Sequence, residues 1–101
     1  MGYAKQVDAN QTAVVAAFRA AGATVLHLHT VGQGCPDLLV GVAGADCLVE
    51  VKDGRKPPSE RQLNGDQLKF RASWRGRRVE VVYSTEDAYG LVVALRKEAG
   101  R

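Results

Sequence analysis

The stretch Gly34-Cys35-Pro36-Asp37-Leu38-Leu39-Val40-Gly41 is followed, after a short interruption, by Cys47-Leu48-Val49-Glu50-Val51-Lys52. Both halves are apolar apart from a few charged residues, which predicts two short strands. The turn Ala43-Gly44-Ala45-Asp46 joins them, and its glycine favours a two-residue hairpin tip at Gly44-Ala45. The fold is therefore expected to be built around this hairpin.

Alternation along the two strands puts three charged side chains on one face of the hairpin. These are Asp37, Glu50 and Lys52, whereas Val49 and Val51 lie on the other face. In the predicted register Asp37 faces Lys52 and lies diagonally from Glu50, within roughly 7–8 Å. A slip of one residue would move the charges to opposite faces.

Charges inside apolar strands call for a partner or a metal, because burying an unpaired charge costs several kcal/mol. Mg²⁺ accepts one or two carboxylates together with water. A nearby lysine can activate water or neutralise charge on a phosphate. The pattern favours metal-assisted phosphodiester hydrolysis. The alternative is a solvated Glu50–Lys52 pair on a surface hairpin, worth under about 1 kcal/mol.

Pro36-Asp37 followed by Glu50-Val51-Lys52 resembles the PD-(D/E)xK nuclease superfamily. With the glycines of the segment 31–41, Asp53-Gly54 and Asp66-Gln67, the chain is similar to the VRR-NUC and Holliday-junction-resolvase-like branch, especially its small stand-alone phage members. The resemblance covers most of the chain, from Asp8 to Leu95. It implies a restriction-endonuclease-like core.

The resemblance also implies roles for the site residues. Asp37, Glu50 and the Val51 carbonyl would hold Mg²⁺ or Mn²⁺, Lys52 would orient or activate water, and Gln67 would assist. Related proteins often carry a glutamate in their first helix that supports the metal. The corresponding positions here are Asn10, Gln11 and Thr12, none of them acidic. For Gln11 an exposed helix position is the favoured interpretation, and a contact with the metal through water is the alternative.

Bulk properties fit one small domain spanning residues 1–101, with residues 1–8 as a loose arm. No apolar run approaches the roughly 20 residues of a membrane span, and the N-terminus lacks a signal pattern. We therefore expect a cytoplasmic protein, in the host cytoplasm if it is phage-encoded, and no membrane association. Cys35 and Cys47 are expected to be free thiols.

The charge distribution says more than the net charge of +3. The segment 52–78 holds nine Lys or Arg residues against three acids, so the rest of the chain is acidic. A basic segment beside an acidic metal site suits a polyanionic substrate, although a solvated basic helix face would look the same. The residues expected to contact nucleic acid are Arg55, Lys56, Arg61, Lys69 and Gly34.

Helical spacing predicts a first helix that follows an N-cap at Asp8 or Asn10, buries Val14 and Phe18, and stops at Gly22. Residues 24–29 alternate as a strand. His27 and His29 in that strand face either the active site or DNA, or point outward from an edge strand, which is slightly favoured.

A second helix is predicted from the N-cap Asn64 to Gly76, with a buried side formed by apolar residues at 68, 70, 72 and 74. Gln67, at its third position, fits a capping box as well as the catalytic role implied by the resemblance. A last strand covers 79–83, and Ser84 with Asp87 opens a final helix. The order helix, three strands, helix, strand, helix predicts an α/β fold with a mixed sheet flanked by helices.

The sequence thus predicts a Mg²⁺- or Mn²⁺-dependent DNA endonuclease acting on duplex or branched, Holliday-junction-like DNA. Because one short chain covers little DNA, a homodimer is expected. One alternative is a catalytically inactive nucleic-acid-binding module on the same fold. Another is an interaction domain of a larger phage or replication assembly.

Overall fold

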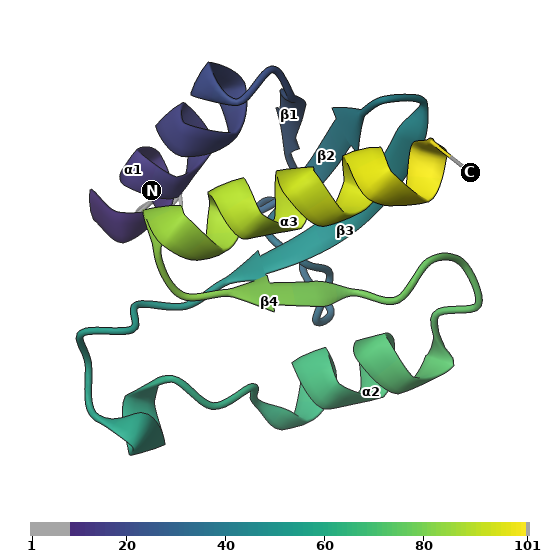
Figure 1. Ribbon diagram of the computed structural model, residues 1–101. Coiled ribbons are helices and arrows are strands. Elements are labelled where there is room, and N and C mark those ends of the chain that lie inside the picture. The colour runs from purple at the N-terminus through teal and green to yellow at the C-terminus, as the bar shows by residue number, and fades with distance from the viewer. Residues whose placement is uncertain (1–8, 101) are drawn as a thin grey trace.

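The molecule is built on a four-stranded sheet with the strand order β1-β2-β3-β4 (Figure 1). The computed structural model describes residues 9–100, so the arm predicted for residues 1–8 lies outside the described range. Strands β1, β2 and β3 pair antiparallel, and β4 joins β3 in parallel. The predicted mixed sheet flanked by helices is confirmed.

The elements follow the predicted order along the chain. Their bounds are α1 Ala9–Ala20, β1 Thr24–His27, β2 Leu38–Val42, β3 Ala45–Val51, a single 3₁₀ turn η1 Pro58–Glu60, α2 Gly65–Ser73, β4 Glu80–Val82 and α3 Thr85–Ala99. Strands β1 and β4 are shorter than the predicted 24–29 and 79–83. Both are the edge strands of the sheet, where pairing on one side only leaves the strand ends unsupported.

The hairpin between β2 and β3 differs from the predicted register by two residues. Leu38 pairs with Val49 and Val42 with Ala45, so the tip is Ala43-Gly44 rather than Gly44-Ala45. Both tip residues have positive φ, 54° and 79°, as in the turn type whose twist matches the flanking strands. Side chains repeat every two residues, so each keeps its predicted face.

The core lies between one face of the sheet and the pair of helices α1 and α3, which pack side by side there (Figure 1). Val14 and Phe18 of α1 and Leu95 of α3 are fully buried against Val49 of β3. This confirms the apolar stripe predicted for the first helix. Gly22 ends that helix region with φ of 94°, which glycine adopts without steric cost.

Helix α2 lies on the opposite side of the sheet, and its predicted start is confirmed (Figure 1). Asn64 and Gln67 form the complete capping box. The predicted buried side is wrong, because none of the nine residues of α2, all of them described, is buried. Leu68 is 53% and Trp74 47% exposed.

Helical geometry alone rules out one common buried face. Residues two apart on a helix point about 200° away from each other, so 68, 70, 72 and 74 cannot share a face. Phe70 and Trp74, one turn apart, instead stack on each other with ring centroids 5.4 Å apart. The helix also ends at Ser73, before the predicted Gly76.

The start of α3 is confirmed as predicted. The Ser84 hydroxyl accepts a hydrogen bond from the Asp87 backbone N–H at 3.1 Å, and the Asp87 carboxylate accepts one from the Tyr83 N–H at 2.9 Å. Among the residues described, no helix has the length and apolar character to cross a bilayer.

Replacing Leu95 with alanine tests the core. Leu95 is fully buried between α3 and the sheet, so Leu95→Ala should lower the free energy of unfolding by about 2–5 kcal/mol in urea titration. The matched control is Val93→Ala, because Val93 is an exposed residue of the same helix. It should change stability by no more than about 0.5 kcal/mol. Equal effects would contradict the assigned packing.

Candidate active site

Glu50 is a buried carboxylate in a strand whose neighbours are apolar. It is 4% exposed and comes from β3. Val49 and Val51 join the core under α1 and α3, so alternation turns Glu50 toward the side of the sheet where α2 lies. There the Gln67 Nε2 donates a hydrogen bond of 2.8 Å to the Glu50 Oε2. A buried charge is thus paired with a donor from another element.

Gln67 also holds the lysine. Its Oε1 accepts hydrogen bonds from the Lys52 Nζ at 3.1 Å and from the Asn64 backbone N–H at 2.9 Å. The Lys52 Nζ lies 3.9 Å from the Glu50 Oε2. The capping-box interpretation of Gln67 is confirmed, and the same amide also joins the two charged side chains.

Asp37 enters from the residue before β2. Extending the observed register by one pair places Asp37 opposite Glu50, rather than opposite Lys52 as predicted. Its Oδ2 accepts a 2.8 Å hydrogen bond from the Val51 N–H. The N–H and C=O of one strand residue point to the same side, so the Val51 carbonyl also lies on the side of Asp37.

The thiol of Cys35 lies beside these carboxylates. Burial raises the pKa of Cys35, and the negative charges of Glu50 and Asp37 raise it further. Cys35 and Cys47 are free thiols, as predicted. This influence agrees with the register of the hairpin, which sets Asp37 opposite Glu50.

The first helix contributes through an amide rather than an acid. The Asn10 Nδ2 donates a 2.7 Å hydrogen bond to the Lys52 carbonyl, while the Lys52 N–H donates to the Val82 carbonyl at 2.9 Å. Lys52 is thereby fixed from α1 and β4 just where β3 ends. Sequence reasoning named Asn10 as a possible N-cap and as one of three non-acidic positions. Asn10 lies inside α1 instead of capping it, and the order of elements alone does not reveal its contact with Lys52.

Gln11 was expected to be exposed, and that interpretation is wrong. It is 7% exposed, among the buried residues of α1. Its neighbours Val14, Val15 and Phe18 on α1 are buried in the core. Position 11 lies three residues before Val14 and seven before Phe18, which puts it on the same helix face.

The glycine loop before β2 supports α2. A Cβ on Gly34 would overlap the Asp66 carbonyl and lie 2.9 Å from the Gln67 N, and Gly34 has φ of 78°. The chain therefore needs glycine here so that the loop can touch the first turn of α2 directly. Gly34 was predicted to contact nucleic acid, and its observed contact is with the backbone that carries Gln67.

The basic residues predicted to contact nucleic acid differ in exposure and in their bonding partners. Arg55 forms two hydrogen bonds of 3.0 Å to the Asp53 carboxylate, which lower the pKa of Asp53 to about 2. Lys56 and Lys69 are exposed, and Arg61 is half-buried. His27 is exposed on the edge strand β1, which fits the outward orientation. His29 lies beyond the end of β1 and is half-buried, with its ring 6.0 Å from that of His27, so the outward orientation does not hold for it.

The donors at the end of β3 suit a hard cation. Within residues 9–100 no group of three or more His, Cys, Asp or Glu side chains is placed to hold a metal. Mg²⁺ needs only one or two carboxylates and completes its shell with carbonyl oxygen and water, and Mn²⁺ accepts the same ligands. Asp37, Glu50 and the Val51 carbonyl fit that description.

The fold and this group of side chains define a restriction-endonuclease-like α/β domain. Comparison with models of known families and with curated proteins finds no match. A solved structure described as a VRR_NUC domain is similar to the chain, with 32% sequence identity and a TM-score of 0.61. The match covers 82% of this chain and 89% of that one. The chain belongs to the VRR_NUC family of nuclease domains.

Two glycines of the loop allow a matched test of how Gln67 is positioned. Gly32→Ala meets no atom within 4 Å and should cost only the penalty of φ of 79°, about 1–2 kcal/mol. Gly34→Ala should carry a similar penalty and also displace α2, because its Cβ overlaps Asp66. Amide hydrogen exchange should then rise across α2 in Gly34→Ala alone. Equal exchange in both variants would contradict the assigned support.

Proposed function

We propose that this chain is a DNA endonuclease of the PD-(D/E)xK type that depends on Mg²⁺ or Mn²⁺. The observation that carries the proposal is the bonded cluster of Glu50, Lys52 and Gln67 with Asp37 across the hairpin. A carboxylate, an ammonium and an amide meet there within hydrogen-bonding or ion-pair distance at the end of a strand.

Each residue has a role in this proposal. Asp37, Glu50 and the Val51 carbonyl would hold the cation, which when bound supplies charge stabilisation at phosphorus and a more acidic water. Lys52 orients the attacking water and offsets charge on the phosphate. Gln67 positions Lys52 and Glu50 relative to each other. Phosphodiester hydrolysis follows from these roles.

The proposed substrate is duplex or branched DNA. The basic excess of the segment 52–78 supports a polyanionic partner, with Lys56, Arg61 and Lys69 as phosphate contacts. Arg55 is already paired with Asp53, so its contribution to phosphate binding is partly offset. Binding should weaken as salt rises, because phosphate contacts release counterions.

A second candidate function is a non-catalytic nucleic-acid-binding module. The observation that favours it is that Glu50 and Lys52 are already hydrogen-bonded through Gln67. The absence of an acid at positions 10, 11 and 12 also favours it. Such a module would bind DNA without any metal-dependent cleavage.

Cleavage of supercoiled, linear and four-way-junction DNA with Mg²⁺, Mn²⁺ or chelator separates the two functions. Lys52→Met should reduce cleavage by at least about 100-fold, and Glu50→Gln should do the same by weakening the cation site. The matched controls Lys97→Met and Glu86→Gln change exposed residues of α3 and should cleave like the wild type. A wild-type protein that binds DNA and never cleaves it would establish the binding module instead.

We further propose a homodimer, which would supply two sites for paired cuts in branched DNA. Its support is the short chain and two exposed apolar side chains, Leu68 on α2 and Trp74 directly after that helix. Light scattering coupled to size exclusion should give twice the chain mass at micromolar concentration. Leu68→Glu should shift it toward the monomer, whereas Val93→Glu on α3 should not. A monomeric wild-type protein would reject the dimer.

A further inference from the structure

A cavity of about 590 Å³ lies apart from the Glu50–Lys52–Gln67 cluster. Most of its lining residues follow β3 and β4 or belong to the first turns of α1 and α3. These ends of the four elements lie at one end of the sheet (Figure 1). Its size is within the range of about 300–1,000 Å³ usual for small-molecule sites. The lining residues used below are Asn10, Gly54, Arg55, Arg61 and Tyr83.

The cavity is joined to the candidate active site by two short links. Asn10, which lines it, donates a hydrogen bond to the Lys52 carbonyl at 2.7 Å. Gly54, two residues after Lys52, donates its N–H to the Tyr83 carbonyl at 3.0 Å. A Cβ on Gly54 would lie 3.2 Å from the Tyr83 Cβ. The chain leaving the active site therefore passes directly over Tyr83.

Arg61 gives the cavity an anion-binding group. Its Nε is buried and, among the residues described, has no hydrogen-bond partner. A buried donor without a partner is costly and calls for a ligand or a bound water. A phosphate oxygen is the acceptor that a guanidinium fits best.

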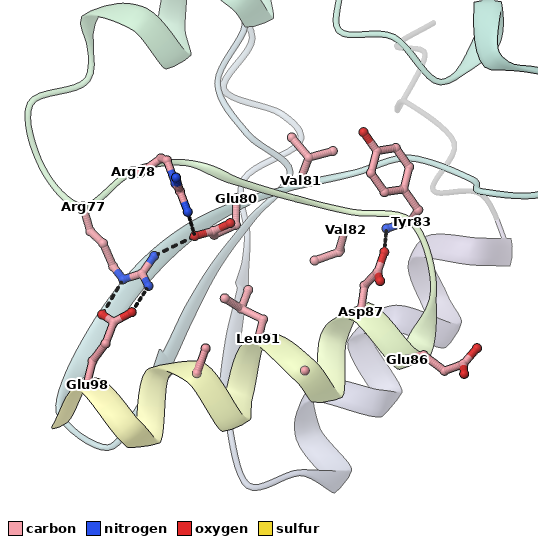
Figure 2. A pocket seen from close by; sticks show the side chains of 12 residues that line it. Arg77, Arg78, Glu80, Val81, Val82, Tyr83, Glu86, Asp87, Leu91 and Glu98 are labelled. Carbon is pink, nitrogen blue, oxygen red and sulfur yellow. Dashed lines mark hydrogen bonds and ion pairs between the residues drawn. The ribbon is translucent and has the colours of Figure 1, made fainter. Parts of the chain in front are cut away.

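Tyr83 gives the cavity an aromatic surface. Its ring is exposed and points away from α3, while Asp87 of α3 is bonded to the Tyr83 backbone (Figure 2). Exposed aromatic rings in nucleic-acid-binding proteins stack on unpaired bases without regard to sequence. The Tyr83 ring can stack on the base of a nucleotide, and the Arg61 guanidinium can bind its phosphate.

A second cavity, between β4 and α3, is also lined by Tyr83 and by two arginines, but both arginines are already bonded to Glu80. It is lined by Glu80, Glu86, Asp87 and Glu98, and the guanidinium of Arg77 is already bonded to Glu80 and Glu98 (Figure 2). Its acidic lining repels a polyanion. Of the two cavities, the one beside Lys52 is therefore the better fit for the phosphate of a nucleotide.

We propose that the cavity holds one unpaired nucleotide of the DNA strand next to the cleaved phosphate. The base lies against the Tyr83 ring and the phosphate against the Arg61 guanidinium. The inference rests on the proposed nuclease function and deepens it. A nucleotide enters the cavity only after leaving its stack, which costs least where DNA is already unpaired. Splayed or branched DNA is thus the preferred substrate over a continuous duplex.

Base stacking is measured with 2-aminopurine placed at successive positions of a splayed-arm DNA, in the presence of chelator so that no cleavage occurs. Wild-type protein should change the fluorescence at one position and not at its neighbours. Tyr83→Leu, which keeps an apolar side chain without a ring, should abolish the change, and Tyr83→Phe should retain it. Equal signals from Tyr83→Leu and wild type would overturn the proposal.

Phosphate binding is measured by salt titration of the same DNA. Arg61→Ala should reduce the slope of log affinity against log salt by about 1. The matched control is Arg78→Ala, because Arg78 is exposed at the other cavity. It should leave the fluorescence change intact. Equal slopes and equal fluorescence in both variants would overturn the assignment of Arg61.

These results separate the two proposals. If the protein cleaves DNA but shows no Tyr83-dependent fluorescence change, the nucleotide-cavity proposal is rejected and the nuclease proposal stands. A Tyr83-dependent change in a protein that never cleaves with Mg²⁺ or Mn²⁺ removes the nuclease and keeps a nucleotide-binding cavity. A protein that does not bind the DNA at all removes both.

Discussion

The hydrogen bonds of the Gln67 side chain are the interactions on which the rest of the site depends. They satisfy a buried carboxylate, Glu50, and hold the ammonium of Lys52 beside it. A buried carboxylate left without partners would cost several kcal/mol. The same amide completes the N-terminal cap of α2. The start of α2 and the arrangement of Glu50 and Lys52 on the sheet therefore depend on the same side chain.

This coupling also explains how α2 is held. None of its nine described residues is buried, so apolar packing contributes little to its position. The contacts that remain are polar or backbone contacts near its ends. Gln67 binds Glu50 and Lys52, Gly34 touches the Asp66 backbone, and the Arg71 Nε donates to the Val79 carbonyl at 3.2 Å. Changes at the charged cluster should therefore be felt along the helix.

The sequence was sufficient for the parts of the fold that periodicity controls. The order of elements and the faces of β2 and β3 were correctly predicted, because alternation survives even a register error of two residues. The register itself was wrong, because Gly44 can be either the first or the second residue of a hairpin tip. The single buried side predicted for α2 was wrong, because residues at 68, 70, 72 and 74 follow a strand-like spacing and cannot share one face of a helix.

The contacts of the site were predictable only in part. Strand alternation and the resemblance to the nuclease family together predicted that Asp37, Glu50, Lys52 and Gln67 lie in one site. The contact of Asn10 could not be found, because a neutral amide bonded to a backbone carbonyl 42 residues away leaves no periodic or charge signal. Gly34 was expected near a phosphate, because a glycine-rich loop shows that backbone approaches closely without showing what it approaches.

The bonded cluster is compatible with a cation without being taken apart. A carboxylate offers about four lone-pair positions, and the bond from Gln67 to the Glu50 Oε2 uses one of them. A cation could therefore bind Glu50 while Gln67 keeps its hold, and the cap of α2 would stay closed. Lys52 would then remain fixed by Gln67 at the edge of the site, rather than being released by the arrival of the metal. The hydrogen bonds from Gln67 to Glu50 and Lys52 are thus as consistent with a preorganised catalytic site as with a non-catalytic one. Preorganised groups need no rearrangement when charge develops in the transition state.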